Sequence, residues 1–371
     1  MSSVRPSRIL NLPSEILEQI ILELDPLHIA SLSHTCTDFA TFIYYDQGSH
    51  YLWRNLYLAQ LLDDPKSSLT RLGFPHYDSQ HSTISIDWMG RLQRIIRART
   101  VIRNPDLCRE SERCTVMKTL LELVRNTPPS MISSNSADDR LSSNLGWLAG
   151  TLRSGTFFDS FASHIATPNT VFVPVTPSQP SFEERQLLGE LRTHFGLTRA
   201  DLTARKRAES RGVVYAMRNY RASNGYGPYL RDRSGRVDWE LMDRIHHVMS
   251  MHIVPTPGID EEESESGDFA DTYTIYPMSL PFCQSEIRSG TDLSEVEDWA
   301  GISGSWECSF CFVDHRWLIL YNNFNLSDDD PLQTALLLDP DFQEAHRTIH
   351  VQISVTSVEE DVAHPAPEDP F

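Results

Sequence analysis

The sequence has few cysteines, few lysines and no long apolar run. Six cysteines in 371 residues do not indicate a disulfide framework, so we expect reduced thiols. No window approaches the roughly 18 consecutive apolar residues that a membrane-spanning helix needs. Arg5 and Arg8 are followed by Asn11 and Pro13, which interrupt any apolar run behind them and argue against a secretory signal. We therefore expect a protein of the cytoplasm, the nucleus or both.

The remaining composition is that of a globular protein. Apolar residues make up 40% of the chain and charged residues 22%. The 17 glycines and 22 prolines are no excess, which excludes a collagen-like or low-complexity chain. At roughly 100–200 residues per domain, the length predicts two or three domains.

Negative charge is concentrated in the last third of the chain. Residues 251–371 contain 25 acidic residues and only three basic ones, Arg288, Arg316 and Arg347. The whole chain carries a net charge of -19, so most of the excess lies in this part. A surface of this sign repels nucleic acids and anionic membranes, and we expect neither as the main partner.

Helical spacing of apolar residues dominates the first two thirds of the chain. It predicts helices near residues 88–99, 117–124, 145–152, 183–195 and 239–253. In the last third of the chain, the spacing of apolar residues changes from helical to strand-like. Residues 306–313 and 317–321 are short, apolar and rich in aromatic side chains, which predicts a hairpin buried on both faces or nearly so. Residues 349–355 alternate between apolar and polar and predict a third strand.

The most informative pattern lies at residues 9–57. Pro13 suits the first turn of a helix, where its missing N–H is no loss. A wide apolar stripe follows at helical spacing, made by Ile16, Leu17, Ile20, Ile21 and Leu24.

Asp25 and Pro26 end that first helix and begin a second. Thr37 or Asp38 begins a third helix, and Trp53 comes after a polar turn. Because fewer than about 50 residues cannot bury all this apolar surface internally, a part of it should face a partner.

This segment resembles the F-box. The matching positions are Leu12-Pro13, Glu15, Ile16-Leu17, Ile20, Leu24-Asp25-Pro26, Leu32-Ser33 with Cys36, and Leu52-Trp53-Arg54. F-box domains bind the Skp adaptor of SCF ubiquitin ligases, whose cullin and RING subunits recruit the E2 enzyme. The resemblance therefore implies a non-catalytic, substrate-recruiting adaptor without a cofactor. It also implies the residues that face the Skp adaptor, which are Leu12, Pro13, Ile16, Leu17, Ile20 and Leu24. An ordinary helical hairpin packed on the rest of the protein is the alternative.

Three further stretches, residues 211–230, 235–254 and 299–325, are similar to segments of large fungal F-box proteins of unknown target. We expect an α+β fold with a three-helix F-box, a mainly helical middle and a small, mainly antiparallel β part that stops short of closing as a barrel. The predicted parts are an F-box domain at 1–62, a mainly helical region at 84–254, a disordered acidic linker at 255–272, a β-rich candidate for substrate recognition at 273–358 and a disordered tail at 359–371.

One basic stretch offers another function. Residues 192–221 contain eight basic residues against Asp201 and Glu209, with two tyrosines between them. Such a segment can bind nucleic acid or a phosphopeptide, and the chain would then be an F-box scaffold acting outside degradation. The simpler interpretation is a solvated face that balances the acidic last third.

The cysteine and histidine patterns do not predict a metal site. Cys308 and Cys311 have the spacing of zinc ligands, but in a strand residues three apart point to opposite faces. On the predicted helix 239–253, His246, His247 and His252 do not form the i, i+4 pair that a metal-binding helix uses.

Overall fold

The computed structural model describes residues 8–45, 49–65, 86–128, 130–132, 142–152, 157–158, 180–253, 280–284, 286–288, 303–327, 330–339 and 341–357. The helices discussed below are α1 (Ser14–Leu22), α2 (Pro26–Ser33), α3 (Thr37–Ala40), α4 (Ser49–Ala59), α6 (Trp88–Arg103), α7 (Arg113–Arg125), α8 (Ser143–Leu152), α10 (Phe182–Phe195), α11 (Ala204–Tyr215), α12 (Trp239–Ile253) and α13 (His315–Asn323). The strands are β1 (Ser130–Ile132), β2 (Glu286–Arg288), β3 (Gly304–Val313) and β4 (Glu344–Ile353). Within these ranges, no helix has both the length and the apolar character needed to cross a bilayer.

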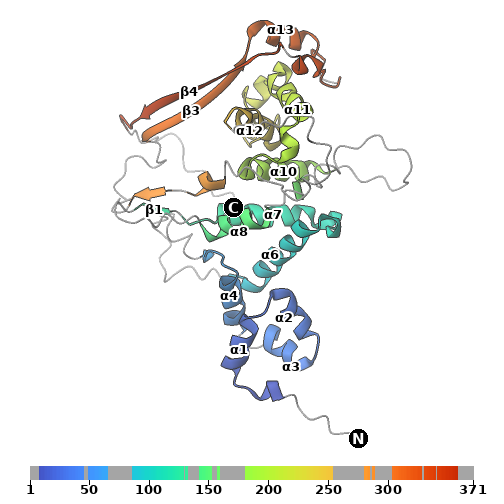
Figure 1. Cartoon of the computed structure of the whole chain (residues 1–371), viewed down its shortest axis with the longest axis vertical. Coiled ribbons are helices and arrows are strands. Elements are labelled where there is room, and N and C mark those ends of the chain that lie inside the picture. The colour runs from blue at the N-terminus through green and yellow to red at the C-terminus, as the bar shows by residue number, and fades with distance from the viewer. Residues whose placement is uncertain are drawn as a thin grey trace, which may run out of the picture.

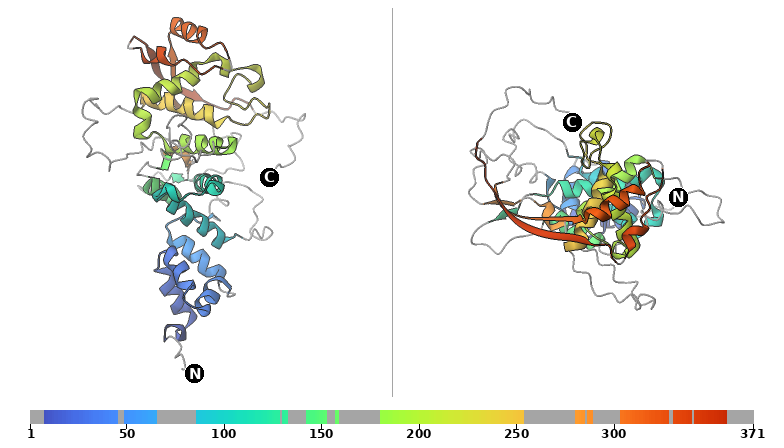
Figure 2. Two further views of the ribbon diagram at one scale, coloured as in Figure 1. Left: turned by 90° about the vertical axis from the view of Figure 1, so that its right-hand side faces the viewer. Right: turned by 90° about the horizontal axis from the view of Figure 1, so that it is seen from above.

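The elements follow one another along a single long axis (Figure 1). Helices α1 to α4 form one end, α6 to α8 lie in the centre, and α10 to α12 come next. The ribbon of β3 and β4, together with α13, lies at the opposite end. A view turned by 90° shows the same succession (Figure 2). The first helices of the chain and its last strands are therefore far apart.

Helix α2 begins where its sequence predicts, whereas Pro13 is the N-cap of α1 and not part of its first turn, and α1 ends at Leu22, before Asp25. The Asp25 side chain accepts a hydrogen bond of 2.9 Å from the backbone N–H of Leu27, and Pro26 occupies the first turn of α2. A π-helical turn, Thr41–Tyr45, follows α3. The indole N–H of Trp53 on α4 donates a 2.9 Å hydrogen bond to the Ile43 carbonyl. Helices α1, α2 and α3 lie within the predicted three-helix segment, α3 with only four residues, and a fourth helix, α4, carries the buried tryptophan.

One apolar core joins the N-terminal helices to the centre of the molecule. It extends from Ile21 on α1 through Trp88 on α6 and Leu120 on α7 to Phe195 on α10, all of them buried. The edge of the Tyr57 ring on α4 meets the ring of Trp88, with centroids 5.4 Å apart. Helices α1 to α10 are therefore packed around shared apolar side chains.

The five helices predicted downstream of residue 84 are confirmed as α6, α7, α8, α10 and α12, and Gly196 ends α10 with a positive φ of 85°. Helix α11 was not predicted. Its buried residues are small, Ala208, Ser210 and Gly212, so its sequence shows little apolar periodicity. Small side chains allow α11 to pack closely against α12 and the residues after α13.

The predicted hairpin is wrong in its second half. Strand β3 covers the first predicted segment, but its antiparallel partner is β4, with Gly304 opposite Ile353 and Val313 opposite Glu344. Residues 317–321 form part of α13 instead. Asp314 accepts a 2.9 Å hydrogen bond from the Arg316 backbone N–H and so caps this helix. A short apolar run does not by itself distinguish a helix from a strand.

The burial predicted for β3 is also wrong. Trp306, Phe310 and Phe312 on this strand are exposed. The alternating strand predicted at 349–355 is confirmed as far as Ile353, where it forms the last part of β4. β3 and β4 form a two-stranded sheet that does not close, and β1 and β2 form a separate short parallel pair.

The segments 255–272 and 359–371, predicted as disordered, lie outside the described residues. The β-rich part at 273–358 is described in part. The predicted domain boundaries stay predictions.

A buried ion network connects α10 to α12. Arg192 on α10 lies between two carboxylates, 2.6 Å from Asp201 and 3.2 Å from Asp243 on α12. Burial alone would raise the pKa of Asp201, but the charge of Arg192 and the hydrogen bonds from Arg192 and from the Thr198 backbone hold that pKa below its ordinary value. The Arg192 charge thus offsets the cost of placing two carboxylates inside the fold.

Replacing Arg192 with methionine should therefore destabilise the protein. Arg192→Met leaves both carboxylates without their cation, and we expect the free energy of unfolding at pH 7 to fall by about 3–5 kcal/mol in urea titrations. Because the folded-state pKa of Asp201 is lowered, its stabilising effect is complete above the ordinary carboxyl range, near pH 4, and is lost as the pH falls. The difference between wild type and variant should shrink below about pH 4. A difference that stays constant down to about pH 3 would contradict this account.

Candidate functional site

Apolar side chains remain exposed on the first two helices. Leu12 just before α1, and Ile16 and Ile20 on α1, are 38%, 48% and 37% exposed. Ile16 and Ile20 are four residues apart on α1 and so lie along one side of the helix, and Leu12 precedes its first turn. Leu27 on α2 is 48% exposed, and Ile9 is also exposed. We call these five residues the N-terminal apolar surface.

Of the six residues that the resemblance implied as facing the Skp adaptor, some are exposed and others are buried. Leu12, Pro13, Ile16 and Ile20 are exposed. Leu17 is only 7% exposed, because one residue turns the helix by about 100° and directs its side chain away from Ile16. Leu24 is partly buried against the core. The sequence analysis did not include Leu27 in this set. Its position directly after Asp25-Pro26, in the first turn of a capped helix, could have indicated that it is exposed.

The N-terminal apolar surface rests on a well-packed support. Helix α1 packs against α4, where the Asn55 amide donates a 2.9 Å hydrogen bond to the Glu18 carboxylate. The rings of Tyr44 and Trp53 stack with centroids 5.8 Å apart. Ile21, on the side of α1 away from solvent, is 1% exposed. The exposed side chains are therefore held in place by a buried opposite face.

Asp25 connects this surface to the rest of the molecule. Its carboxylate caps α2 and also accepts hydrogen bonds of 2.8 and 2.9 Å from the guanidinium of Arg99 on α6. Burial opposes ionisation, but the Leu27 N–H and Arg99 together lower the pKa of Asp25 below its ordinary value. The Asp-Pro pair of the motif therefore ends one helix, caps the next and binds a helix that comes much later in the sequence.

Most of the basic segment 192–221 is engaged inside the protein. Besides the buried Arg192, Lys206 pairs with Glu209 on the same helix at 3.3 Å. Arg211 pairs with Glu344 on β4 at 2.8 Å. Arg218 donates to the backbone carbonyls of Ser327 and Asp330. These cations therefore support the fold, and the segment is not a free basic face.

The histidines of α12 have separate environments. His247 is buried, with Nδ1 2.7 Å from the Ser210 hydroxyl and Nε2 2.9 Å from the Asp201 carbonyl oxygen. Because a carbonyl only accepts, Nε2 carries the proton and Nδ1 accepts from Ser210. Burial lowers the pKa of His247, which keeps the ring neutral. This residue therefore has a structural role between α11 and α12.

His252 lies in a group that the sequence did not reveal. Potential ligand atoms of His252, Cys311 and Glu344 lie within 4.8 Å of one another. The Glu344 carboxylate already accepts hydrogen bonds from Arg211, from Tyr215 and, at 2.8 Å, from His252. Burial raises the pKa of the Cys311 thiol, which favours its neutral form. With the carboxylate neutralised by Arg211, the group is best explained as the attachment of the ribbon to α11 and α12.

Because Asp25 both caps α2 and pairs with Arg99, we expect its replacement to lower the stability of the protein. Asp25→Ala removes both the helix cap and the ion pair, and we expect it to lower the free energy of unfolding by about 1 kcal/mol or somewhat more. Asp25→Asn keeps an oxygen that accepts from the Leu27 N–H but loses the charge that pairs with Arg99. In urea titrations, Asp25→Asn should therefore lower the free energy of unfolding by less than Asp25→Ala does. Equal losses in the two variants would show that the cap contributes nothing.

Comparison with known proteins agrees with the geometry of this region. A family model described as F-box-like matches residues 9–59, which run from the turn before α1 to the end of α4. No curated protein matches the chain, and no solved structure matches it. The matched range contains the whole N-terminal apolar surface and the buried Trp53. Residues 9–59 are therefore an F-box-like domain.

Proposed function

We propose that this protein is the substrate-recruiting adaptor subunit of an SCF-type (Skp–cullin–F-box) ubiquitin ligase, in the cytoplasm, the nucleus or both. The observation that carries the proposal is the exposure of Leu12, Ile16 and Ile20 within an F-box-like domain. F-box-like domains typically bind Skp-type adaptors. Such a partner would cover the N-terminal apolar surface, which includes Leu27, together with the exposed Pro13.

The energies involved are sufficient for docking. Complete burial of one Leu or Ile side chain is worth about 1.5–3 kcal/mol, and the residues of the N-terminal apolar surface are each exposed by more than a third. Covering several of them yields several kcal/mol before the polar rim is counted. Because α1 is already packed against α4, little further ordering of the helix is needed on binding.

The arrangement along the long axis fits a recruiting subunit. The F-box-like domain and the elements around α11, β3 and β4 lie at opposite ends of the molecule (Figure 1). A target held at the second end would leave the Skp-facing end free. The protein would then need no catalytic residue of its own, because it acts by raising the concentration of target lysines near the E2 enzyme.

A charge placed on the exposed side of α1 should abolish docking. The variant Ile16→Asp/Ile20→Asp would put two carboxylates into an apolar interface, and we expect recovery of a co-expressed Skp-type adaptor to fall at least about tenfold, since 1.4 kcal/mol already changes an equilibrium tenfold. Co-purification with quantitative immunoblotting measures this.

The matched control is Ile253→Asp at the end of α12. Ile253 is 47% exposed, similar to Ile16, but it lies outside the F-box-like domain. The control should retain the adaptor fully, and thermal unfolding of all variants should confirm that each is folded. Full retention of the adaptor by the folded double variant would count against the proposal.

A further inference from the structure

The contact that attaches the ribbon of β3 and β4 to α12 also brings three kinds of metal ligand together. His252 lies in the last turn of α12, Cys311 on β3 and Glu344 at the start of β4. One ligand atom of each residue, an imidazole nitrogen, a thiol sulfur and a carboxylate oxygen, lies within 4.8 Å of the other two. These are the three side-chain groups that bind Zn²⁺ in proteins. The attachment of the ribbon therefore has the donor set of a zinc site.

The register of the ribbon places two of these ligands on one face. Cys311 lies opposite His346, and Val313 lies opposite Glu344. Cys311 and Glu344 are therefore diagonal neighbours across the two strands, and their side chains share a face of the ribbon. Cys308 lies three residues before Cys311 on the same strand, so its side chain points to the opposite face. Only one cysteine of the pair thus takes part.

The face that carries Cys311 rests on α12. The Cys311 thiol donates to the Met249 sulfur at 3.3 Å, and the His252 Nε2 lies 2.8 Å from a Glu344 carboxylate oxygen. Met249 and His252 are three residues apart on α12 and therefore lie on the same side of the helix. The third ligand thus comes from the helix surface that the ribbon covers.

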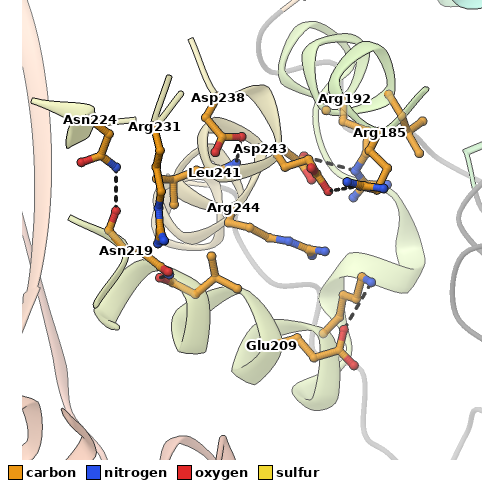
Figure 3. Close-up of a pocket in the computed structure, with 15 residues that line it drawn as sticks. Arg185, Arg192, Glu209, Asn219, Asn224, Arg231, Asp238, Leu241, Asp243 and Arg244 are labelled. Carbon is orange, nitrogen blue, oxygen red and sulfur yellow. Dashed lines mark hydrogen bonds and ion pairs between the residues drawn. The ribbon is translucent and has the colours of Figure 1, made fainter. Parts of the chain in front are cut away.

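Helix α12 is held in place by its two neighbours. Figure 3 shows Asp243 of α12 next to Arg192 of α10, an ion pair of 3.2 Å. On α11, the Ser210 hydroxyl donates to the His247 Nδ1 of α12 at 2.7 Å. His252 is therefore presented by a fixed helix, and little ordering is needed to gather the ligands around an ion.

The distances admit an ion after a small shift. A tetrahedral Zn²⁺ with bonds of about 2.1 Å to nitrogen and to oxygen separates those two atoms by about 3.4 Å. Because the His252 Nε2 and the Glu344 oxygen are 2.8 Å apart, the imidazole needs to withdraw by only about 0.6 Å. The ion then replaces the hydrogen bond between them, and the imidazole proton moves from Nε2 to Nδ1.

Arg211 and Tyr215 orient the Glu344 carboxylate and leave part of it open. Arg211 donates from Nε and Nη2 to one carboxylate oxygen at 3.0 and 2.8 Å, and Tyr215 donates to the other oxygen. A carboxylate has about four lone-pair sites, and carboxylates that bind metals are themselves held by outer hydrogen bonds of this kind. On binding, Cys311 releases its thiol proton to solvent, so one thiolate and one carboxylate match the charge of Zn²⁺.

A buried nitrogen beside the group lacks a partner. The ring of His346 stacks on that of His252, with centroids 5.3 Å apart and an angle of 2° between the planes. The His346 Nε2 is buried and has no hydrogen-bond partner among the described residues. An unsatisfied buried nitrogen is costly, and a water molecule in the fourth position of a zinc ion at His252 would bring a donor near it.

We propose that His252, Cys311 and Glu344 bind one zinc ion, which clamps the ribbon of β3 and β4 to α12. Ligands of nitrogen, sulfur and oxygen suit Zn²⁺, whereas Ca²⁺ and Mg²⁺ bind oxygen ligands almost exclusively. The Met249 sulfur beside Cys311 would favour Cu(I), so copper enters the test as a competitor. The inference does not depend on the proposed function, because this end of the molecule lies away from the F-box-like domain (Figure 1).

The test uses the full chain, freed of metal with EDTA and kept reduced. Isothermal titration calorimetry with ZnCl₂ measures affinity and stoichiometry, and Co²⁺ in place of the colourless Zn²⁺ reveals a bound thiolate by its charge-transfer absorption. The variants are Cys311→Ser and His252→Gln, whose amide can still donate to Glu344. Cys308→Ser, on the same strand but the opposite face, is the matched control. Circular dichroism and thermal unfolding establish that each variant is folded.

We expect wild type and Cys308→Ser to bind one zinc ion, to show the thiolate absorption with Co²⁺ and to unfold at a higher temperature when zinc is present. Zinc affinity should fall at least about tenfold in Cys311→Ser and in His252→Gln. No zinc binding by wild type, or unchanged affinity in the folded variants, would overturn the inference. Binding of Cu(I) that depends on Cys311, with none of Zn²⁺, would overturn it as well.

X-ray absorption of the zinc-loaded wild type decides without any variant. We expect one sulfur ligand at about 2.3 Å and the remaining ligands, nitrogen and oxygen, at about 2.0–2.2 Å. A coordination shell with no sulfur, or with more than one, would place the ion elsewhere and contradict the site.

Discussion

Helix α1 carries apolar side chains on the face that the rest of the chain buries and also on a face that it leaves exposed. Leu17 and Ile21 are buried, Ile21 within the shared core, but Ile16 and Ile20 on the same helix stay in contact with water. Leaving apolar surface in water costs about 25 cal/mol per Å², so the sequence maintains this exposure at the expense of stability. A partner that covers the helix explains why the side chains are apolar, and the F-box-like match at residues 9–59 indicates the kind of partner.

The rest of the structure holds that helix in a fixed relation to the distant end. Apolar side chains from α1 to α10 share one core, and the ion pair between Asp25 and Arg99 joins α2 to α6. The buried network around Arg192 then joins α10 to α12. A succession of packed helices therefore connects the surface proposed for the Skp-type adaptor with α12, on the side of the molecule away from the F-box-like domain (Figure 1). For a protein that acts by proximity, such a connection sets the distance between its two partners.

Local signals predicted the helices with apolar periodicity well, because the burial of one face creates that periodicity. They failed for α11, whose contacts depend on small residues such as Gly212, and for α13, where Asp314 caps an apolar run that also suits a strand. At the N-terminal apolar surface the motif predicted the positions of the apolar residues. It could not predict that Ile16 is exposed and Leu17 is buried, because this depends on which face of α1 packs against α4. The grouping of His252 with Glu344 likewise depends on contacts between residues distant in sequence.

The central claim is that the exposed side of α1 is a docking surface, and hydrogen exchange measures this most directly. Backbone amides of the intact protein would be followed by mass spectrometry with and without a purified Skp-type adaptor. The account predicts slower exchange confined to residues 9–33, which include α1 and α2, and unchanged exchange in α10 to α12. Unchanged exchange at residues 9–33 with the adaptor in saturating amounts would contradict it.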